Sequence, residues 1–192
     1  MDTNANNNRE SFEDQQVIFV DTHLIQKAVE GLQRAREEFQ TLLEQAEGGD
    51  ASVYYDLGVR YTEGDGIDKD PAQAARWFAL ASEDGDLRAT DLLGRCYQSG
   101  AGVEKDEARA AELFQQAAEQ DYAPAQCDLG LSYENGSGVE KDEARAAECY
   151  LQAAEQDYAP AQTNLAVCYF NGIGVDKDVE CAHQWLLSLI HI

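Results

Sequence analysis

Cysteine and histidine are the residue types here that could bind a metal or carry out redox chemistry, and the chain holds five cysteines and three histidines. They are Cys96, Cys127, Cys149, Cys168, Cys181, His23, His183 and His191. No C-x-x-C pair or other zinc-ligand spacing occurs, and the histidines stand near no cluster of carboxylates or thiols. We therefore predict no metal, no cofactor and no disulfide framework. Free thiols of this kind pack as small apolar groups and suit a reducing compartment.

An enzymatic constellation is also missing from the sequence. No nucleophile, base and orienting group recur in one neighbourhood, and no glycine-rich loop follows a strand. We therefore expect a non-enzymatic protein. The function that remains is the binding of another molecule, in which tyrosine, phenylalanine and arginine most often act as anchors.

Composition narrows the choice of partner. The chain has 192 residues, 44% hydrophobic and 27% charged, which is enough for one domain or a short repeat array with a core. Its net charge of −23 repels nucleic-acid phosphates and anionic lipid surfaces. No apolar run approaches the about 20 residues that cross a bilayer, and residues 1–14 lack the order of a secretory signal. We expect a cytoplasmic protein that binds neither nucleic acid nor membrane, with export by a non-classical route left open.

An internal repeat is the main signal. An offset of 36 residues aligns four copies without a gap. The shared residues are Leu57, Leu93, Leu129 and Leu165; Tyr61, Tyr97, Tyr133 and Tyr169; Gly64, Gly100, Gly136 and Gly172; Gly66, Gly102, Gly138 and Gly174; and Asp70, Asp106, Asp142 and Asp178. We place the units at 50–85, 86–121, 122–157 and 158–192.

Each unit reads as a helical hairpin. Leu57 and Tyr61 stand four residues apart on an apolar stripe, and Gly64 ends that first helix. Asp70 then caps a second helix, with Pro71 in its first turn. One hairpin cannot bury both faces of its helices, so neighbours must stack. The sequence predicts an all-α fold, a right-handed α-α superhelix or solenoid with one concave and one convex wall.

One copy carries a motif of the form A-x(3)-LG-x(2)-Y-x(2)-G-x-GV-x-KD. Its residues are Ala125, Leu129, Gly130, Tyr133, Gly136, Gly138, Val139, Lys141 and Asp142, followed by Ala146, Ala153 and Ala154. This pattern resembles the Sel-1-like repeat, which is similar to the tetratricopeptide repeat, and the resemblance covers residues 50–192. The departures are Ala166 for glycine, Val53 for alanine and Ile67 for valine. The resemblance implies an adaptor or scaffold that binds other proteins.

The same resemblance raises one enzymatic alternative, because a few members of the family are linked to penicillin-like compounds. No lysine stands three residues after Ser52, Ser82, Ser99, Ser132 or Ser137. A hydrolase or lactam-binding enzyme is therefore the least favoured alternative. Exported members of the family usually carry paired cysteines in every repeat, and this chain lacks that pairing.

The N-terminal segment has two parts. Residues 1–16 are polar and acidic and show no apolar periodicity, which is typical of a flexible arm. Residues 17–49 are predicted to form an N-terminal cap, with a helix over 22–47 that Gly48 and Gly49 stop. Its apolar residues, from Leu24 to Ala46, then cover the first repeat. The alternative is an amphipathic helix that binds a partner.

The copies differ most in the middle of their first helices, whereas residues 100–126 and 136–162 are identical except at four positions. As the resemblance to tetratricopeptide arrays implies, the first helices line the concave wall. The candidate partner-binding residues are then Tyr55, Val59, Asp91, Arg95, Gln98, Leu131, Glu134, Val167 and Phe170. Such a wall suits an extended or helical peptide. The alternative is that Val59, Leu131 and Val167 only pack against the next layer.

Charge and the C-terminal residues give two further expectations. Residues 48–192 carry a net charge of −17, which indicates a solvated surface or a partner with a basic segment. Residues 185–192 are too apolar for the outer face of a free solenoid. We expect self-association through this end or a missing following repeat. A structural, self-assembling spacer is thus the second alternative to an adaptor.

Overall fold

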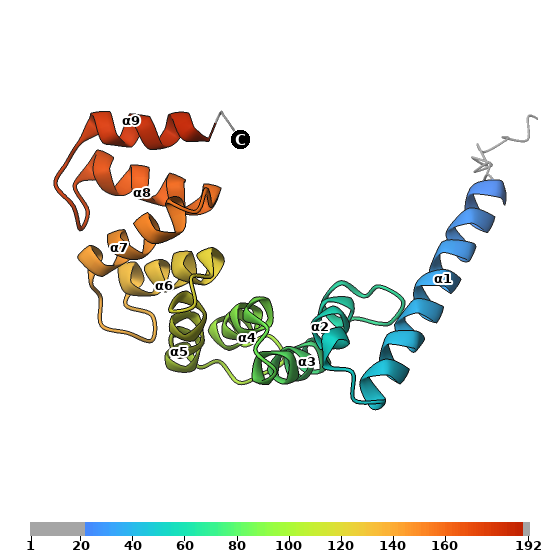
Figure 1. The fold of residues 1–192 in the computed structure, drawn as a ribbon. Coiled ribbons are helices and arrows are strands. Elements are labelled where there is room, and N and C mark those ends of the chain that lie inside the picture. Colours follow the sequence, from blue (N-terminus) through green and yellow to red (C-terminus); the bar gives the residue numbers. More distant parts are fainter. Residues whose placement is uncertain (1–21, 190–192) are drawn as a thin grey trace, which may run out of the picture.

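A computed structural model describes residues 22–189, and this part of the chain contains helices and no strand. The helices are α1 (Thr22–Glu47), α2 (Tyr54–Glu63), α3 (Pro71–Glu83), α4 (Leu87–Ser99), α5 (Glu107–Ala118), α6 (Ala123–Asn135), α7 (Glu143–Ala154), α8 (Ala159–Asn171) and α9 (Val179–Ser188), with a short 3₁₀ helix η1 (Ala51–Val53) before α2. The hairpins α2–α3, α4–α5, α6–α7 and α8–α9 follow one another along an arc (Figure 1). The all-α, right-handed solenoid predicted from the repeat is confirmed.

The two helices of a hairpin take different places in the arc. The first helices, α2, α4, α6 and α8, lie on its inner side, and the second helices lie on its outer side (Figure 1). The turn between them begins with a glycine in the left-handed conformation, such as Gly100 with φ 77°. An aspartate then caps the second helix: Asp70 Oδ1 accepts hydrogen bonds from the backbone N–H groups of Ala72 and Gln73 at 3.0 and 3.1 Å.

The second glycine of each turn sets the distance between hairpins. A Cβ added at Gly102 would overlap the carbonyl oxygen of Pro71 in the preceding hairpin, and one at Gly138 would overlap that of Glu107. Only glycine lets the turn approach the start of the preceding outer helix this closely. The same contact recurs at every junction of the array.

A ring held against a glycine joins the two helices within each of the first three hairpins. A Cβ at Gly94 would lie 2.6 Å from Cε1 of Phe114, and one at Gly130 would lie 2.6 Å from Cε1 of Tyr150. Both rings are fully buried. In the last hairpin the aligned residues are Ala166 and Leu186, so the packing there is different in kind.

The C-terminal half of α1 occupies the place of an outer helix of an additional, incomplete hairpin. The 36-residue offset aligns Ala35 with Pro71, and Gly66 approaches the carbonyl of Ala35 as Gly102 approaches that of Pro71. Further along, Gly49 has φ 89° where Gly85 has φ 95°. The repeat register therefore extends back into α1, beyond the four units seen in the sequence.

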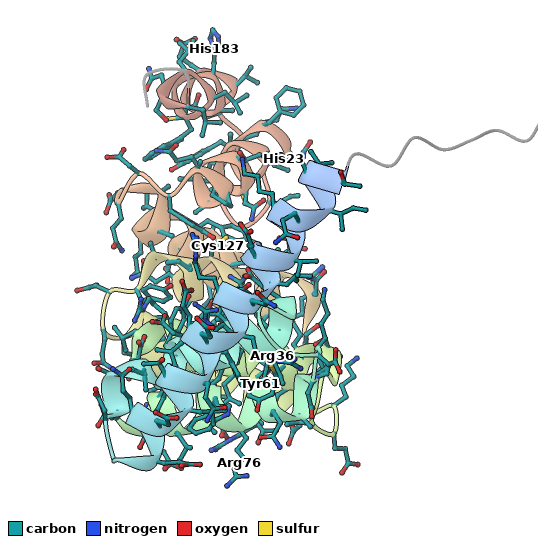
Figure 2. All side chains as sticks on the ribbon, turned by 90° about the vertical axis from the view of Figure 1, so that its right-hand side faces the viewer. His23, Arg36, Tyr61, Arg76, Cys127 and His183 are labelled. Carbon is teal, nitrogen blue, oxygen red and sulfur yellow. The ribbon has the colours of Figure 1, made fainter. Side chains whose placement is uncertain are left out.

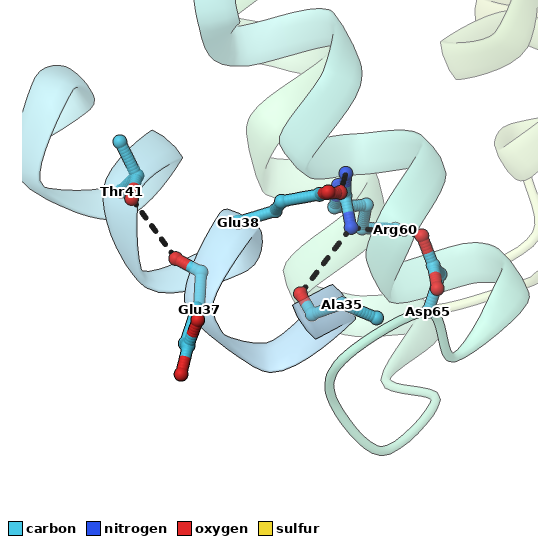
Figure 3. A network of polar contacts seen from close by, with 6 residues as sticks. All are labelled: Ala35, Glu37, Glu38, Thr41, Arg60 and Asp65. Carbon is cyan, nitrogen blue, oxygen red and sulfur yellow. Dashed lines mark hydrogen bonds and ion pairs between the residues drawn. The ribbon is translucent and has the colours of Figure 1, made fainter. Parts of the chain in front are cut away.

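Polar contacts from one arginine fasten α1 to the first hairpin. Arg60 of α2 pairs with Glu38 at 3.0 Å and with Asp65 at 2.8 Å, and its guanidinium approaches the carbonyl oxygen of Ala35 at 3.5 Å (Figure 3). The aligned residues of the later hairpins, Cys96, Ser132 and Cys168, are small, and the last two are buried. An arginine fits here because α1 brings the Glu38 carboxylate and the Ala35 carbonyl oxygen to this position.

Packing against the first hairpin is confined to the second half of α1. Phe39 and Ala46 are buried against the first hairpin, and Leu42 and Leu43 pack beside them. The first half of the helix extends past the array, and its apolar residues are exposed. Contact with the first hairpin therefore comes from the second half of α1, and the cap predicted over residues 17–49 stays a prediction. The predicted arm at 1–16, with residues 17–21 and 190–192, lies outside the described residues.

Candidate functional site

Two of the candidate residues, Tyr55 and Arg95, contact the neighbouring first helix. The Arg88 guanidinium of α4 stacks over the Tyr55 ring of α2 at 4.0 Å. Arg95 Nε of α4 donates to Asp128 Oδ2 of α6 at 2.7 Å. Each seam of the inner wall thus has its own side-chain chemistry, because these positions differ from copy to copy.

The seam between α4 and α6 carries the most charge. Arg95 pairs with Asp91, one turn earlier on α4, at 3.1 Å and with Asp128 across the seam at 2.7 Å. The Asp91 side chain is 4% exposed, that of Asp128 is 16% exposed and that of Arg95 is 44% exposed. One guanidinium therefore bridges a buried carboxylate and a carboxylate that is only partly buried.

Burial makes this group of charges electrostatically unusual. Desolvation raises the pKa of Asp91 to about 7; the positive charge of Arg95 opposes this shift and the negative charge of Asp128 adds to it. Desolvation also raises the pKa of Asp128. Among the described residues, no donor reaches Oδ1 of Asp91. When both carboxylates are ionised, the group carries one negative charge more than its single arginine can balance.

Two tyrosines that precede the next first helices, Tyr122 and Tyr158, lie within electrostatic range of these charges. Tyr122 interacts electrostatically with Asp91, Tyr55 and Tyr158, and Tyr158 interacts with Arg95 and Asp128. Burial raises the pKa of the Tyr122 and Tyr158 hydroxyls, so both stay neutral. We call this set the inner-wall cluster, and its members are Tyr55, Arg88, Asp91, Arg95, Tyr122, Asp128 and Tyr158.

The remaining candidates on the first three hairpins have separate surroundings. Tyr55 and Val59 line a groove of about 560 Å³ between α1 and α2, and Gln98 is half-buried on α4. Leu131 packs against the core between the third and fourth hairpins. Glu134 accepts a hydrogen bond from the Tyr150 hydroxyl. Leu131 therefore helps to join the third and fourth hairpins, whereas Glu134 joins the two helices of the third hairpin.

Val167 and Phe170 lie apart from the other candidates. They are 47% and 54% exposed and line an apolar hollow of about 320 Å³ at the open end of the array, with Val179 and Leu186. The structure therefore brings together Tyr55, Asp91 and Arg95 but leaves this pair at the far end.

Four members of the inner-wall cluster were not predicted from the sequence: Arg88, Tyr122, Asp128 and Tyr158. A signal for the two tyrosines exists in the sequence. The aligned residues in the first two copies, Asp50 and Asp86, cap their helices with the side chain, whereas Tyr122 and Tyr158 make no such bond. Giving up a cap costs about 1 kcal/mol, and residues that break a local rule often serve a site.

The thiols provide no reactive group. Burial raises the pKa of Cys127 to about 12 and that of Cys149 and Cys168 to about 11, so these residues stay protonated at neutral pH. All five cysteines are free. Within residues 22–189, no group of three His, Cys, Asp or Glu side chains is placed to hold a metal ion. His183 points away from the array at its far end (Figure 2).

No helix within residues 22–189 is both long and apolar enough to span a bilayer.

These hairpins and their varied inner wall define the class of protein as a helical repeat solenoid. The family model of the Sel1 repeat matches residues 51–86, 88–122, 123–158 and 159–189. The chain therefore belongs to the Sel1 repeat family, as the motif indicated. Members of this family are generally protein-interaction modules and typically non-enzymatic scaffolds.

Solved structures give the same result. The chain is 35% identical, with a TM-score of 0.75, to c5321, a protective antigen present in uropathogenic Escherichia coli strains, over 80% of this chain and 33% of that one. It is 33% identical, with a TM-score of 0.78, to a Sel1 repeat protein from Oxalobacter formigenes, over 82% of this chain and 62% of that one. The chain thus spans less than two thirds of either relative. No curated protein matches it.

Proposed function

We propose that the chain is a non-enzymatic adaptor or scaffold that binds an extended or helical segment of a partner protein along its inner wall, and that a basic side chain of the partner is held at the inner-wall cluster. The observation that carries this proposal is the shared guanidinium of Arg95. Two carboxylates compete for it, so the seam has room for one more positive charge.

Of the two carboxylates, the less buried one, Asp128, would contact the basic side chain of the partner. The Asp128 side chain is 16% exposed, while that of Asp91 is only 4% exposed and adds its charge in a low-dielectric setting. A lysine or arginine entering here would lie among the tyrosines of the cluster, whose ring faces attract cations. The net charge of −17 over residues 48–192 favours the approach of a basic segment and speeds the encounter.

The other candidate residues would contribute to partner binding in different ways. Tyr55 and Val59 would contact the partner in the groove beside α1, and Gln98 would contact it next to Arg95. Leu131 would support the wall by packing between the third and fourth hairpins, and Glu134 by its bond to Tyr150 within the third hairpin. Val167 and Phe170 would extend the surface toward the last hairpin.

A displayed library of random peptides, selected on the purified chain, tests the proposal. We expect the selected peptides to share a lysine or arginine, and Asp128→Asn to weaken their binding about tenfold or more. The matched control is Glu112→Gln. Glu112 aligns with Arg76, which points away from the outer side of the array (Figure 2), so this variant should bind like the natural chain.

Circular dichroism and thermal melts of both variants confirm that they remain folded. Selected peptides without a basic residue would contradict the proposal, and so would equal binding by the Asp128 variant.

A further inference from the structure

The open C-terminal end of the array presents an apolar surface. Seven residues of α8 and α9 line the hollow of about 320 Å³ found there: Ala166, Val167, Phe170, Val179, Ala182, His183 and Leu186. Leu187 beside them is also exposed. Trp185 of α9, in contrast, packs against the core formed by α6, α7 and α8. An apolar surface of this kind marks an interaction site more often than a free face.

Within the array the same surface is always covered by a helix. Tyr150, which aligns with Leu186, is fully buried, whereas Leu186 is 45% exposed. The covering residues are Ala161, Leu165 and Cys168 of α8, which join Tyr150 in one core cluster. Their spacing is i, i+4 and i+7. The open end is therefore shaped to receive one more helix with an apolar stripe at that spacing.

The first half of α1 carries such a stripe. Ile25, Val29 and Leu32 stand at i, i+4 and i+7, and they are 48%, 42% and 69% exposed. This half of α1 projects beyond Ala35, the residue that aligns with the start of the outer helices (Figure 1). Val29 and Leu32 also form one wall of a cavity of about 360 Å³, with the turn after α2 as the other wall.

Charge at the two ends is complementary. Residues 22–36 carry a net charge of +2, from Lys27, Arg34 and Arg36 against Glu30, in a chain whose total is −23. Residues 159–189 carry a net charge of −2. Two copies of the chain would therefore attract each other end to end and repel each other when like ends meet.

We propose that the first half of α1 of one copy covers the open end formed by α8 and α9 of a second copy, so that the chain associates head to tail. The two surfaces lie at opposite ends of the arc, so a single copy does not bring them together (Figure 1). The contact is heterologous: each added copy leaves one end of each kind free, and the assembly grows until it closes as a ring.

Variants that block one end each provide the test, with mass measured by light scattering and sedimentation over a range of concentrations. We expect the natural chain to exceed the monomer mass as concentration rises. Val29→Glu blocks the α1 end and Leu186→Glu blocks the α8–α9 end, and each alone should weaken association about tenfold or more. Both side chains are exposed, so each variant should keep its fold, which circular dichroism checks.

Mixing the two blocked variants is the decisive measurement. Each keeps one competent end, so an equimolar mixture should form a 1:1 dimer that grows no further. The matched controls add the same charge at exposed sites elsewhere on the same two helices: Gln45→Glu in α1 and Gln184→Glu in α9 should assemble like the natural chain.

Three results would overturn the proposal. They are a natural chain that stays monomeric at high micromolar concentration, a Val29→Glu variant that still self-associates, and a mixture that forms no dimer. The second of these would indicate pairing between like C-terminal ends. Asp128→Asn should leave assembly unchanged, so the outcome is separate from that of the inner-wall proposal.

Discussion

The second and third hairpins, α4–α5 and α6–α7, have nearly the same outer helix and different inner helices. In both, a glycine receives a buried ring and a second glycine meets the preceding hairpin. At one inner position the second hairpin has Asp91 and the third has Cys127, and both side chains are buried. The comparison shows that hairpin spacing depends on backbone contacts shared by all copies, while the seams of the inner wall are free to change their chemistry.

The largest effect is expected where the hairpins approach each other. Gly138→Ala should destabilise the chain by about 3 kcal/mol, because the added Cβ overlaps the Glu107 carbonyl and the residue keeps φ 74°. Gly136→Ala is the matched control. It shares the positive φ of 71°, but its Cβ meets only the Lys141 side chain and backbone at 3.3 Å or more, so about 1 kcal/mol is expected.

Chemical denaturation of both variants measures the difference. Equal losses at the two glycines would mean that the second one does not set the spacing. The aligned pair Gly102 and Gly100 of the second hairpin should repeat the result.

Much of this fold could be predicted from sequence because glycines, aspartate caps and apolar spacing recur at fixed positions. The extension of the repeat register into α1 could not be predicted, because α1 shares the backbone conformation of the later outer helices but not their residue types. Phe39 aligns with Ala75, and Leu42 aligns with Phe78. Phe39 is larger than Ala75 and Leu42 is smaller than Phe78, and both side chains of α1 pack against the first hairpin. The repeat pattern of residue types therefore fades one hairpin before the repeat of structure does.

The inner wall could be predicted only in part. Variation between copies identified Asp91 and Arg95, but a position on a helix does not say how closely the next helix lies. For that reason Asp91 proved to be buried and Leu131 proved to pack between hairpins. Tyr122 and Tyr158 were not predicted because they precede α6 and α8, whereas the candidates came from the middle of the first helices.

Asp91 and Cys127 should differ in how pH affects the stability of their hairpins. Folding raises the pKa of Asp91 to about 7, so the folded chain holds a proton that the unfolded chain has released between about pH 4 and 7. The Asp91 contribution to stability therefore falls as pH rises through this window. Cys127, with a pKa of about 12, has no such dependence at neutral pH.

Asp91→Asn removes this titration. Relative to the natural chain, its free energy of unfolding should gain roughly 2 kcal/mol or more between pH 4 and pH 8, and the gain should level off above pH 7. Denaturation of both proteins across this range measures the difference. A constant difference at all pH values would mean that Asp91 is solvated in the folded chain.

A smaller effect distinguishes the two buried rings. Tyr150 donates its hydroxyl proton to Glu134, whereas the second hairpin has Phe114 and Gln98 at these positions. Tyr150→Phe should cost about 1.5 kcal/mol, because it leaves a half-buried carboxylate without its donor. Adding Glu134→Gln reproduces the pair of the second hairpin and should recover most of the loss. Losses that simply add in a double-mutant cycle would show that the two residues are not coupled.

The smallest effect concerns the turn that precedes each inner helix. Before the second hairpin this turn has Gly85 with φ 95°, but before the third it has Asp121 with φ 59°, a conformation that glycine adopts more easily. Asp121→Gly should therefore stabilise the chain by roughly 0.5 kcal/mol, since relief of strain is partly offset by the greater entropy of the unfolded chain. Gly85→Asp is the reciprocal variant and should destabilise it by a similar amount. Thermal melts of the pair measure both shifts, and changes of the same sign would show that the two turns differ in more than this residue.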